Sequence, residues 1–439
     1  MKKRLSMVMS LGLFAVSLVF ANGSQETTKQ TEGPVTLTFW YENAGPNRTP
    51  YMEELIRRFE AENPNIKIEM TGLSNSDAKS KFDVAVAAKQ TPDISGMQVQ
   101  WLAGYINNGS LEPLDSYLEG WKEFKDQNKQ VIQAMRNMDV NGQVYMLPNT
   151  FNFTPTYWGR ADLFAEKGLK APETWDEFFD NIKALNDPAK GISGFSIRGG
   201  AGAPDQLTDY MYAYSGIDTP FVDGKSTIND PKNVEAVERL AALYKKYTPE
   251  SDITNAYKEM VAAFDSGAAA IIQHNLGSYG EHAKAFKPEQ FFAFPAPKSP
   301  NGKRVASFAS NATGFVMYKS CKHKDAAFKF ISFMCSEPSQ SYFNEIIGQL
   351  PPSAAAINED WVQSRQHIKA IMTVLNDPST ISFPSPHYLP DFASINNKIA
   401  QPSFQAVLAG KMSAKDMLDQ WADALNKAYE EYNTYVRKQ

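Results

Sequence analysis

Four short clusters of aromatic, amide and hydroxyl side chains occur where predicted strands end. They span residues 40–43 (WYEN), 149–152 (NTFN), 273–275 (QHN) and 308–311 (FASN). Amides, hydroxyls and carboxylates offer fixed donors and acceptors to a hydroxyl-rich ligand, and a flat ring gives apolar area against the C–H face of a sugar. Each cluster alone is more typical of a capped loop, but ligands of open α/β sheets bind outside the carboxyl ends of strands. Four clusters at that position together indicate a binding site.

Catalytic motifs are scarce in comparison. The sequence contains neither HExxH nor another short paired metal motif among its five histidines, and it contains no G-x-S-x-G. Gly224, Lys225 and Ser226 resemble the end of a P-loop, but Thr219 stands where the first glycine is required. A glycosidase with two carboxylates remains the enzyme alternative, because acidic residues are numerous. We expect a binding protein that uses no metal and no cofactor.

Composition limits the class of protein further. The chain has 439 residues, of which 43% are hydrophobic, 12% aromatic and 21% charged, as in ordinary globular proteins. Its length suggests two or three domains. The net charge of −5 gives no basic excess for a phosphate backbone, so we expect no nucleic-acid partner.

The N-terminus has the pattern of an export signal. Lys2, Lys3 and Arg4 precede an apolar run over residues 5–20, and small residues before position 22 predict cleavage after Ala21. The alternative is an uncleaved membrane anchor, since the run is only slightly shorter than a span. Residues 22–33 are polar and predict a flexible mature N-terminus. No cysteine lies near this junction, so lipid attachment there is not expected.

The rest of the chain alternates between strand and helix patterns, which predicts parallel pairing with right-handed crossovers. A capping box at Thr174 and Glu177 opens one of the helices. We expect two buried thiols at Cys321 and Cys335, because the helix between them separates the sulfurs too far for a disulfide. The strands are predicted at residues 35–41, 66–70, 94 onward, 144–148, 154–158, 268–273 and twice within 305–318, and the main helices at 50–63, 77–89, 174–184, 231–247, 257–266, 325–335 and 398 to the end.

Seven motifs in order resemble the family 1 extracellular solute-binding proteins, the sugar-binding components of ABC importers, over nearly the whole mature chain. The resemblance implies an α/β fold of the two-lobed periplasmic-binding-protein type (type II), with three chain crossings at the hinge, which we expect near Pro148, Pro295 and Gly348. Residues 34–148 plus 296–347 would then form the first lobe, and residues 149–295 plus 348–439 the second. The motifs are residues 38–41 (TFWY), 59–66 (FEAENPNI), 91–94 (TPDI) with 101–105 (WLAGY), 109–115 (GSLEPLD), 141–148 (NGQVYMLP), 160–164 (RADLF) with 172–178 (PETWDEF), and 409–413 (AGKMS).

The resemblance implies a ligand between the lobes, held by residues from both. Trp40 and Trp101 would stack on a sugar, and the polar side chains would bind its hydroxyls. The expected set from the first lobe is Trp40, Glu42, Gln98, Trp101, Phe308 and Asn311, and the set from the second lobe is Asn149, Asn152, Asp205, Asn275, Gln349 and His387.

The roles of three positions in the expected binding site stay open. Where relatives often have Gly-Pro-Trp, this chain has Asn275, Leu276 and Gly277, so the expected aromatic platform is lost or displaced to Tyr279. His274 fits a ligand contact or a core position equally well. Arg198 could bind an anionic ligand, but we favour a structural bond to an internal carboxylate.

The expected function is therefore capture of a sugar or oligosaccharide in the periplasm and its delivery to the permease subunits of an ABC transporter, by a protein that is a monomer. The alternative within the same role is a polyol phosphate or another small anion. Closure would require contacts made with both lobes at once.

Overall fold

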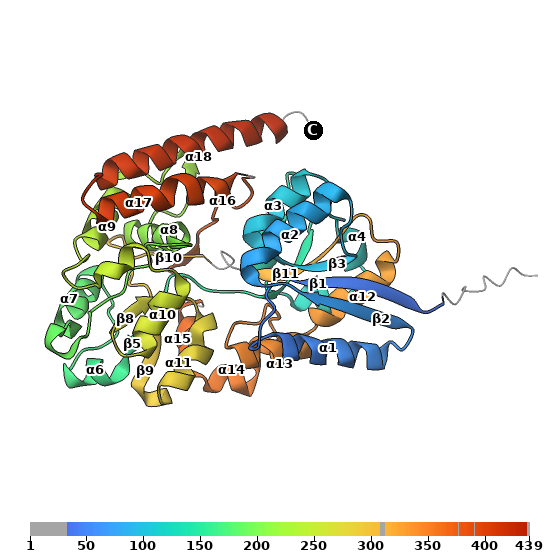
Figure 1. Ribbon diagram of the computed structural model, residues 1–439, viewed down its shortest axis with the longest axis horizontal. Helices are drawn as coiled ribbons and strands as arrows, with labels where there is room; N and C mark the ends of the chain where they lie inside the picture. Colours follow the sequence, from blue (N-terminus) through green and yellow to red (C-terminus); the bar gives the residue numbers. More distant parts are fainter. Residues whose placement is uncertain (1–32, 308–311, 376, 390, 437–439) are drawn as a thin grey trace, which may run out of the picture.

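The structure, a computed structural model, describes residues 33–307, 312–375, 377–389 and 391–436. The chain forms two α/β lobes that lie side by side, each with its own sheet and helices (Figure 1). This confirms the predicted two-lobed α/β architecture. Phe308 and Asn311 of the expected site lie outside the described residues.

A mixed five-stranded sheet forms the centre of the first lobe, in the order β2-β1-β3-β11-β4. β1 pairs in parallel with β2 and β3, whereas β11 runs antiparallel to both β3 and β4. Alternate side chains of β1 are buried, as its apolar and polar alternation predicts. The strands are β1 (Val35–Tyr41), β2 (Ile66–Gly72), β3 (Ile94–Gln98), β4 (Met146–Thr150) and β11 (Thr313–Met317).

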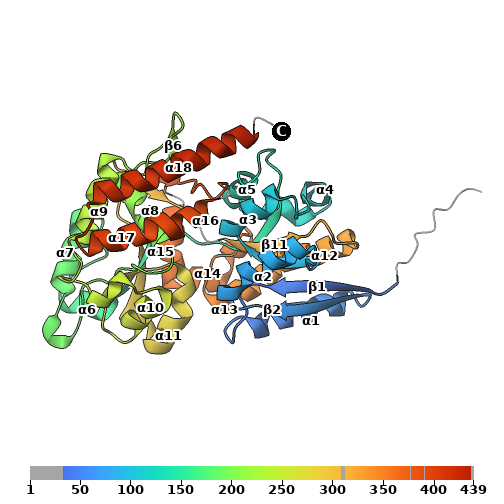
Figure 2. The ribbon, with the colours of Figure 1, turned by 45° about the horizontal axis from the view of Figure 1, so that its top comes forward.

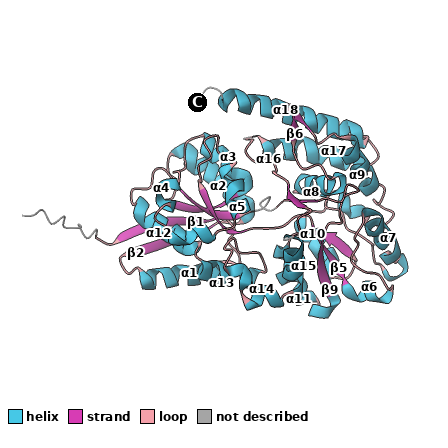
Figure 3. Cartoon of the chain, turned by 180° about the vertical axis from the view of Figure 1, so that it is seen from behind, coloured by secondary structure: helices cyan, strands magenta, loops and turns pink. Residues whose placement is uncertain are grey.

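Helices cover both faces of this sheet (Figure 3). One face packs against α1, α12 and α13, and the other packs against α2, α3 and α5. Both cysteine thiols are free and buried here, as expected. The helices are α1 (Thr49–Glu62), α2 (Asn75–Ala88), α3 (Val99–Asn107), α4 (Asp115–Leu118), α5 (Lys129–Arg136), α12 (Lys324–Met334) and α13 (Glu337–Ile347).

The second lobe differs from the expected parallel arrangement. Its three-stranded sheet has the order β8-β5-β9, and both pairs are antiparallel. The alternation of strands and helices did not reveal this. The segments that connect these strands are long enough to return the chain either parallel or antiparallel to the previous strand. The strands are β5 (Thr156–Arg160), β8 (Ile271–Gln273) and β9 (Phe291–Pro295).

The helices of the second lobe surround this sheet and extend beyond it (Figure 1). The predicted capping box at Thr174 is confirmed at the start of α7. The helices are α6 (Ala161–Glu166), α7 (Trp175–Leu185), α8 (Ala203–Ser215), α9 (Pro231–Ala241), α10 (Tyr257–Asp265), α11 (Tyr279–Ala285), α14 (Asp360–Ser364), α15 (Gln366–Leu375), α16 (Phe392–Ile395), α17 (Gln401–Leu408) and α18 (Ala414–Val436).

Two small sheets complete the fold. β6 (Phe221–Val222) pairs with β7 (Lys225–Ser226), and β10 (Arg304–Ala306) pairs with β12 (Thr380–Ser382). Val305 packs in the core of the second lobe, whereas Ala312 packs in that of the first. We therefore propose that the chain passes back to the first lobe between these two residues, rather than near Pro295 as expected.

The lobes also meet beside α18. This helix runs along the second lobe toward the first, and α16 lies next to α3 (Figure 2). Within the described ranges, none of the helices combines the length and apolar character needed to cross a bilayer.

Candidate functional site

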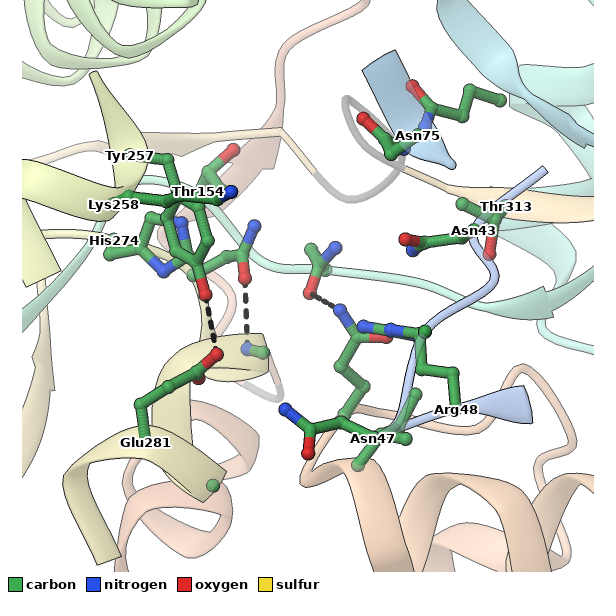
Figure 4. Close-up of a pocket in the computed structure, with 18 of the residues that line it drawn as sticks. Asn43, Asn47, Arg48, Asn75, Thr154, Tyr257, Lys258, His274, Glu281 and Thr313 are labelled. Atoms are coloured by element: carbon green, nitrogen blue, oxygen red, sulfur yellow. Dashed lines mark hydrogen bonds between the residues drawn. The ribbon is translucent and has the colours of Figure 1, made fainter. Parts of the chain in front are cut away.

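A cavity of about 890 Å³ lies between the lobes, at the carboxyl ends of the first lobe's parallel strands. The first lobe contributes the loop after β1, the residues that follow β2, and the start of α3. The second lobe contributes the starts of α8 and α10 and the residues that follow β8. Figure 4 shows Asn43, Asn47 and Arg48 on one side, facing Tyr257 and His274 on the other.

Five of the expected site residues line this cavity: Gln98, Asn152, Asp205, Asn275 and Gln349. Two of them, Asn152 and Asn275, belong to the strand-end clusters, and Asn43, Gln273 and His274 of the same clusters line the cavity as well. The cluster at 308–311 falls outside the described residues. The cavity thus draws on the other three clusters, from both lobes.

Local geometry positions the polar groups. Asn275 begins a short 3₁₀ helix, where its Oδ1 accepts a hydrogen bond from the main-chain nitrogen of Gly277 at 2.9 Å. Gly348 ends α13 with φ of 72°, a left-handed conformation that glycine adopts without strain, and the next residue turns into the cavity. That residue, Gln349, donates from Nε2 to Oδ1 of Asn152 at 3.4 Å.

Asp205 lies in the first turn of α8, where the helix N-terminus favours a negative charge. Its Oδ1 accepts a hydrogen bond from Nδ2 of Asn396 at 3.1 Å. Burial raises the pKa of Asp205, and the nearby Arg198 charge opposes that shift. One turn along the helix, burial raises the pKa of Asp209 to about 8.

An aromatic face is present in the cavity, although not at the positions expected from the sequence. The ring of Tyr257 stacks on the imidazole of His274, with centroids 4.8 Å apart and an interplanar angle of 27°. The Tyr257 hydroxyl donates to Oε1 of Glu281 at 2.8 Å (Figure 4). Burial, with a smaller contribution from the Arg198 charge, lowers the pKa of His274 to about 3. The buried Nδ1 of this neutral ring has no hydrogen-bond partner among the residues that the structure describes.

The expected stacking tryptophans do not line the cavity. Trp40 stacks on Phe82, with centroids 6.0 Å apart, and Trp101 meets the same ring edge-on at 6.2 Å. Both pack against the core of the first lobe and are partly exposed. Their contact with a ligand stays a prediction, and so does the suggested platform at Tyr279, which stacks on His367.

Glu42, Asn149 and His387 also lie away from this cavity. Glu42 is buried against Gly96, and burial raises its pKa to about 7. Asn149 is buried and accepts a hydrogen bond from the Thr313 hydroxyl at 3.2 Å. His387 is buried beside Phe392 and lines a separate cavity of about 650 Å³ between the loop after α5 and α18.

Arg198 lines the cavity, and the sequence had left open whether it binds a ligand or holds its own loop. Its Nε donates to the carbonyl of Ala201 at 2.6 Å, within its own loop. Among the described residues it forms no ion pair with a carboxylate, so the structural bond is made to a main-chain carbonyl of the same loop, while the charge of Asp205 acts on it from nearby. Its contact with an anionic ligand stays a prediction. The loop is held close to residues 252–255, where a side chain on Gly199 would overlap the carbonyl of Asp252.

Other cavity residues were missed in the sequence. Tyr257 and Lys258 begin a helix and Arg48 precedes one, so no periodic pattern distinguishes them from surface residues. The polar run after β1, residues 42–49, was the one available signal. The described residues hold no group of three histidine, cysteine or acidic side chains that could bind a metal ion.

Comparisons with known proteins agree with this architecture. The sequence profile of bacterial extracellular solute-binding proteins matches residues 45–341. The multiple sugar-binding protein of Streptococcus mutans is 25% identical over 387 residues, which cover 82% of this chain and 84% of that protein. The mannitol-binding protein of Pseudomonas aeruginosa is 25% identical over 391 residues, which cover 84% and 87%. The maltose-bound structure of T. maritima MalE3 superposes with a TM-score of 0.76 at 22% identity, covering 89% of this chain and 99% of that one.

Proposed function

Because this chain belongs to the family of bacterial extracellular solute-binding proteins, we propose that it captures a saccharide between its lobes and delivers it to the permease of an ABC importer. A sugar is the ligand that we favour, and a polyol is a chemically similar second candidate. The names of the relatives support this class, since one binds multiple sugars and another binds mannitol.

One observation carries the proposal: the cavity between the lobes combines a stacked ring face with a buried ring nitrogen that has no hydrogen-bond partner among the described residues. Tyr257 and His274 form the face. The buried Nδ1 of His274 can accept a hydrogen bond from a ligand hydroxyl or donate one to it, depending on the tautomer. An unpartnered buried polar atom costs about 1–3 kcal/mol, which a ligand hydroxyl would recover. The volume of about 890 Å³ falls in the range of small-molecule sites and leaves room for more than one sugar ring.

Binding residues on both lobes give the ligand its effect on conformation. A ligand that contacts Gln98 on one lobe and His274 on the other stabilises the closed form through its differential affinity for that form. We propose that the lobes rotate about the chain passages near Pro148, between Val305 and Ala312, and near Gly348. The closed form would then dock on a two-subunit permease as a monomer.

The remaining parts of the role are also proposals. Export through the N-terminal signal with cleavage after Ala21 would place the mature chain in the periplasm. Catalysis is not part of the proposal, because the relatives are binding proteins. A bound saccharide should accordingly be recovered unchanged after long incubation.

Calorimetry tests the function. The purified protein is titrated with a panel of mono- and oligosaccharides and hexitols, and at least one should bind with a micromolar dissociation constant, or about −8 kcal/mol. The variant His274→Phe keeps a flat ring but removes both nitrogens, so it should weaken binding about tenfold. His323→Phe is the matched control, because His323 is exposed and outside the cavity. Silence across the whole panel would contradict the proposed function.

A further inference from the structure

The balance of basic and acidic side chains around the cavity differs from that of the whole chain. The protein carries a net charge of −5, yet basic side chains outnumber acidic ones in the cavity wall. Burial raises the pKa of Asp209 to about 8, so that carboxyl is mostly protonated at neutral pH. The basic set is Arg48, Arg198, Lys258 and Lys284, and the acidic set is Asp205, Asp209 and Glu281.

Arg198 is a partly buried cationic group of this wall that keeps donors for a ligand. Lys258 and Lys284 are exposed, whereas Arg48 and Arg198 are partly buried, and Arg48 bonds to the buried Tyr41. The Nε of Arg198 is bonded to the Ala201 carbonyl, and neither Nη atom donates a hydrogen bond to another residue of the described chain. Other arginines show the contrast: Arg136 and Arg160 each meet a carboxylate, at 2.7 and 2.6 Å.

The loop around Arg198 is shaped to hold this group in place. Gly202 has a φ of 82°, and a side chain there would overlap the guanidinium group. Side chains at Gly199 and Gly200 would overlap main-chain atoms of residues 252–255. These close contacts fix the direction of the guanidinium group. The side chain therefore loses little further conformational entropy when a ligand binds.

We infer that the solute is a saccharide that carries a carboxylate, and that this carboxylate binds to the two Nη groups of Arg198. The inference rests on the proposed function and names its substrate class. A planar guanidinium fork matches a carboxylate through two parallel hydrogen bonds. The Tyr257 ring and the His274 nitrogen then remain for the sugar ring and its hydroxyls.

The neighbourhood of Asp205 favours a carboxylate over a phosphate ester. Asp205 is close enough to Arg198 for the two charges to interact. Asp205 repels any anion bound here, and it repels the nearly two negative charges of a phosphate ester about twice as strongly as the single charge of a carboxylate, which Arg198 offsets more fully. The class is therefore a hexuronate or an oligosaccharide that contains one.

Matched ligand pairs test the inference. The full-length mature protein is titrated with galacturonate and glucuronate and their di- and trisaccharides, beside the neutral galactose and glucose counterparts and mannitol 1-phosphate. An acidic member should bind about 10- to 100-fold more tightly than its neutral counterpart, the range expected for a charge-assisted bidentate contact. Its affinity should also fall as NaCl is added, because salt screens the interaction.

Variants identify the residue responsible. Arg198→Gln should remove the preference for the acid while changing the affinity for the neutral sugar less than threefold, and Arg198→Lys should retain part of it. Arg239→Gln is the matched control, since Arg239 pairs with Asp176 outside the cavity. Thermal unfolding of each variant checks that the fold is intact, and if Arg198→Gln fails to fold, the Arg198→Lys variant and the salt dependence of the wild type decide.

Equal affinity for acid and neutral sugar, a preference that persists in Arg198→Gln, or binding of the phosphate ester alone would each overturn the inference and leave saccharide capture intact. Failure of every saccharide, acidic or neutral, would instead overturn the proposed function and the inference with it.

Discussion

Gln206 and Gln273 each donate a hydrogen bond from the side-chain amide to the other's main-chain carbonyl, at 2.8 and 2.9 Å. This reciprocal pair joins the first turn of α8 to the end of β8, and both residues line the cavity. It therefore fixes the distance between Asp205 and His274, which are the chain neighbours of the pair.

Breaking this pair should affect both stability and binding. Gln273→Leu removes the hydrogen bond from the Gln273 amide to the Gln206 carbonyl, so we expect the free energy of unfolding to fall by about 0.5–1.5 kcal/mol. The ligand affinity should fall as well, because α8 and β8 lose their fixed spacing. Denaturant unfolding and calorimetry measure the two effects. Gln90→Leu, at an exposed position outside the cavity, should change neither, and an unaltered Gln273→Leu protein would show that the pair has no positioning role.

Gly96 makes room for the buried Glu42 side chain. A Cβ at position 96 would overlap Oε2 of Glu42, so Gly96→Ala should lower the free energy of unfolding by about 1–3 kcal/mol. In a Glu42→Ala background the same substitution should cost much less, because the overlapping atom is gone. Gly104→Ala is the control: no atom lies within 4 Å of its added Cβ, and it should raise stability by about 0.5–1 kcal/mol within α3. Additive effects of the substitutions at 96 and 42 would contradict this contact.

Asp209 should make stability depend on pH in an unusual direction. Burial raises its pKa in the folded protein from 3.8 to about 8, so the folded state binds a proton that the unfolded state releases. Its contribution to stability is fully present below pH 3.8 and is lost as the pH rises toward 8, by up to about 1.4 kcal/mol per pH unit. Asp209→Asn cannot lose this proton. It should therefore unfold at higher denaturant concentration than the wild type at pH 8 but show little difference near pH 4.

The control for this prediction is Asp423→Asn, which alters an exposed carboxyl on α18. Its difference from the wild type should be nearly the same at pH 4 and pH 8. A pH-independent difference for Asp209→Asn would mean that Asp209 is already ionised in the folded protein at low pH.

Tyr257 should contribute mainly through its ring. Tyr257→Phe removes the hydrogen bond to Glu281 but keeps the stacked face, so the dissociation constant for the saccharide should rise less than threefold. Tyr257→Ala removes the face and should raise the constant by about tenfold or more. Tyr244→Ala, whose hydroxyl bonds the Glu250 carbonyl outside the cavity, is the control. Equal effects of the phenylalanine and alanine substitutions would assign the contribution to the hydroxyl instead.

Local patterns predicted the elements of the fold better than they predicted which elements meet. The alternation of residues 35–41 and the capping box at Thr174 each depend on neighbours in sequence, and both are confirmed. β8 and β9 run antiparallel to β5, and this direction depends on the path of the long segments that connect the strands. A local sequence pattern holds no information about that path. The glycine-rich stretch before α8 also gave no sign that its loop lines the cavity, because Gly199 and Gly200 are required by contacts with residues 252–255, far along the chain.

The same limit explains the candidate site. Strand-end position was sufficient to find Asn152 and Asn275, because the sheet edge itself places them. It could not indicate that the rings of Trp40 and Trp101 meet Phe82 of α2. Nor could it find Tyr257, which reaches the cavity through the packing of α10 beside β8.

A crystal structure of the protein with its tightest-binding saccharide is the most direct test of ligand capture between the lobes. We expect ligand density in the cavity between the lobes, against the Tyr257–His274 face and within hydrogen-bond distance of His274 Nδ1 and of at least one first-lobe residue such as Gln98. Density at another surface, or density that contacts one lobe alone, would contradict it.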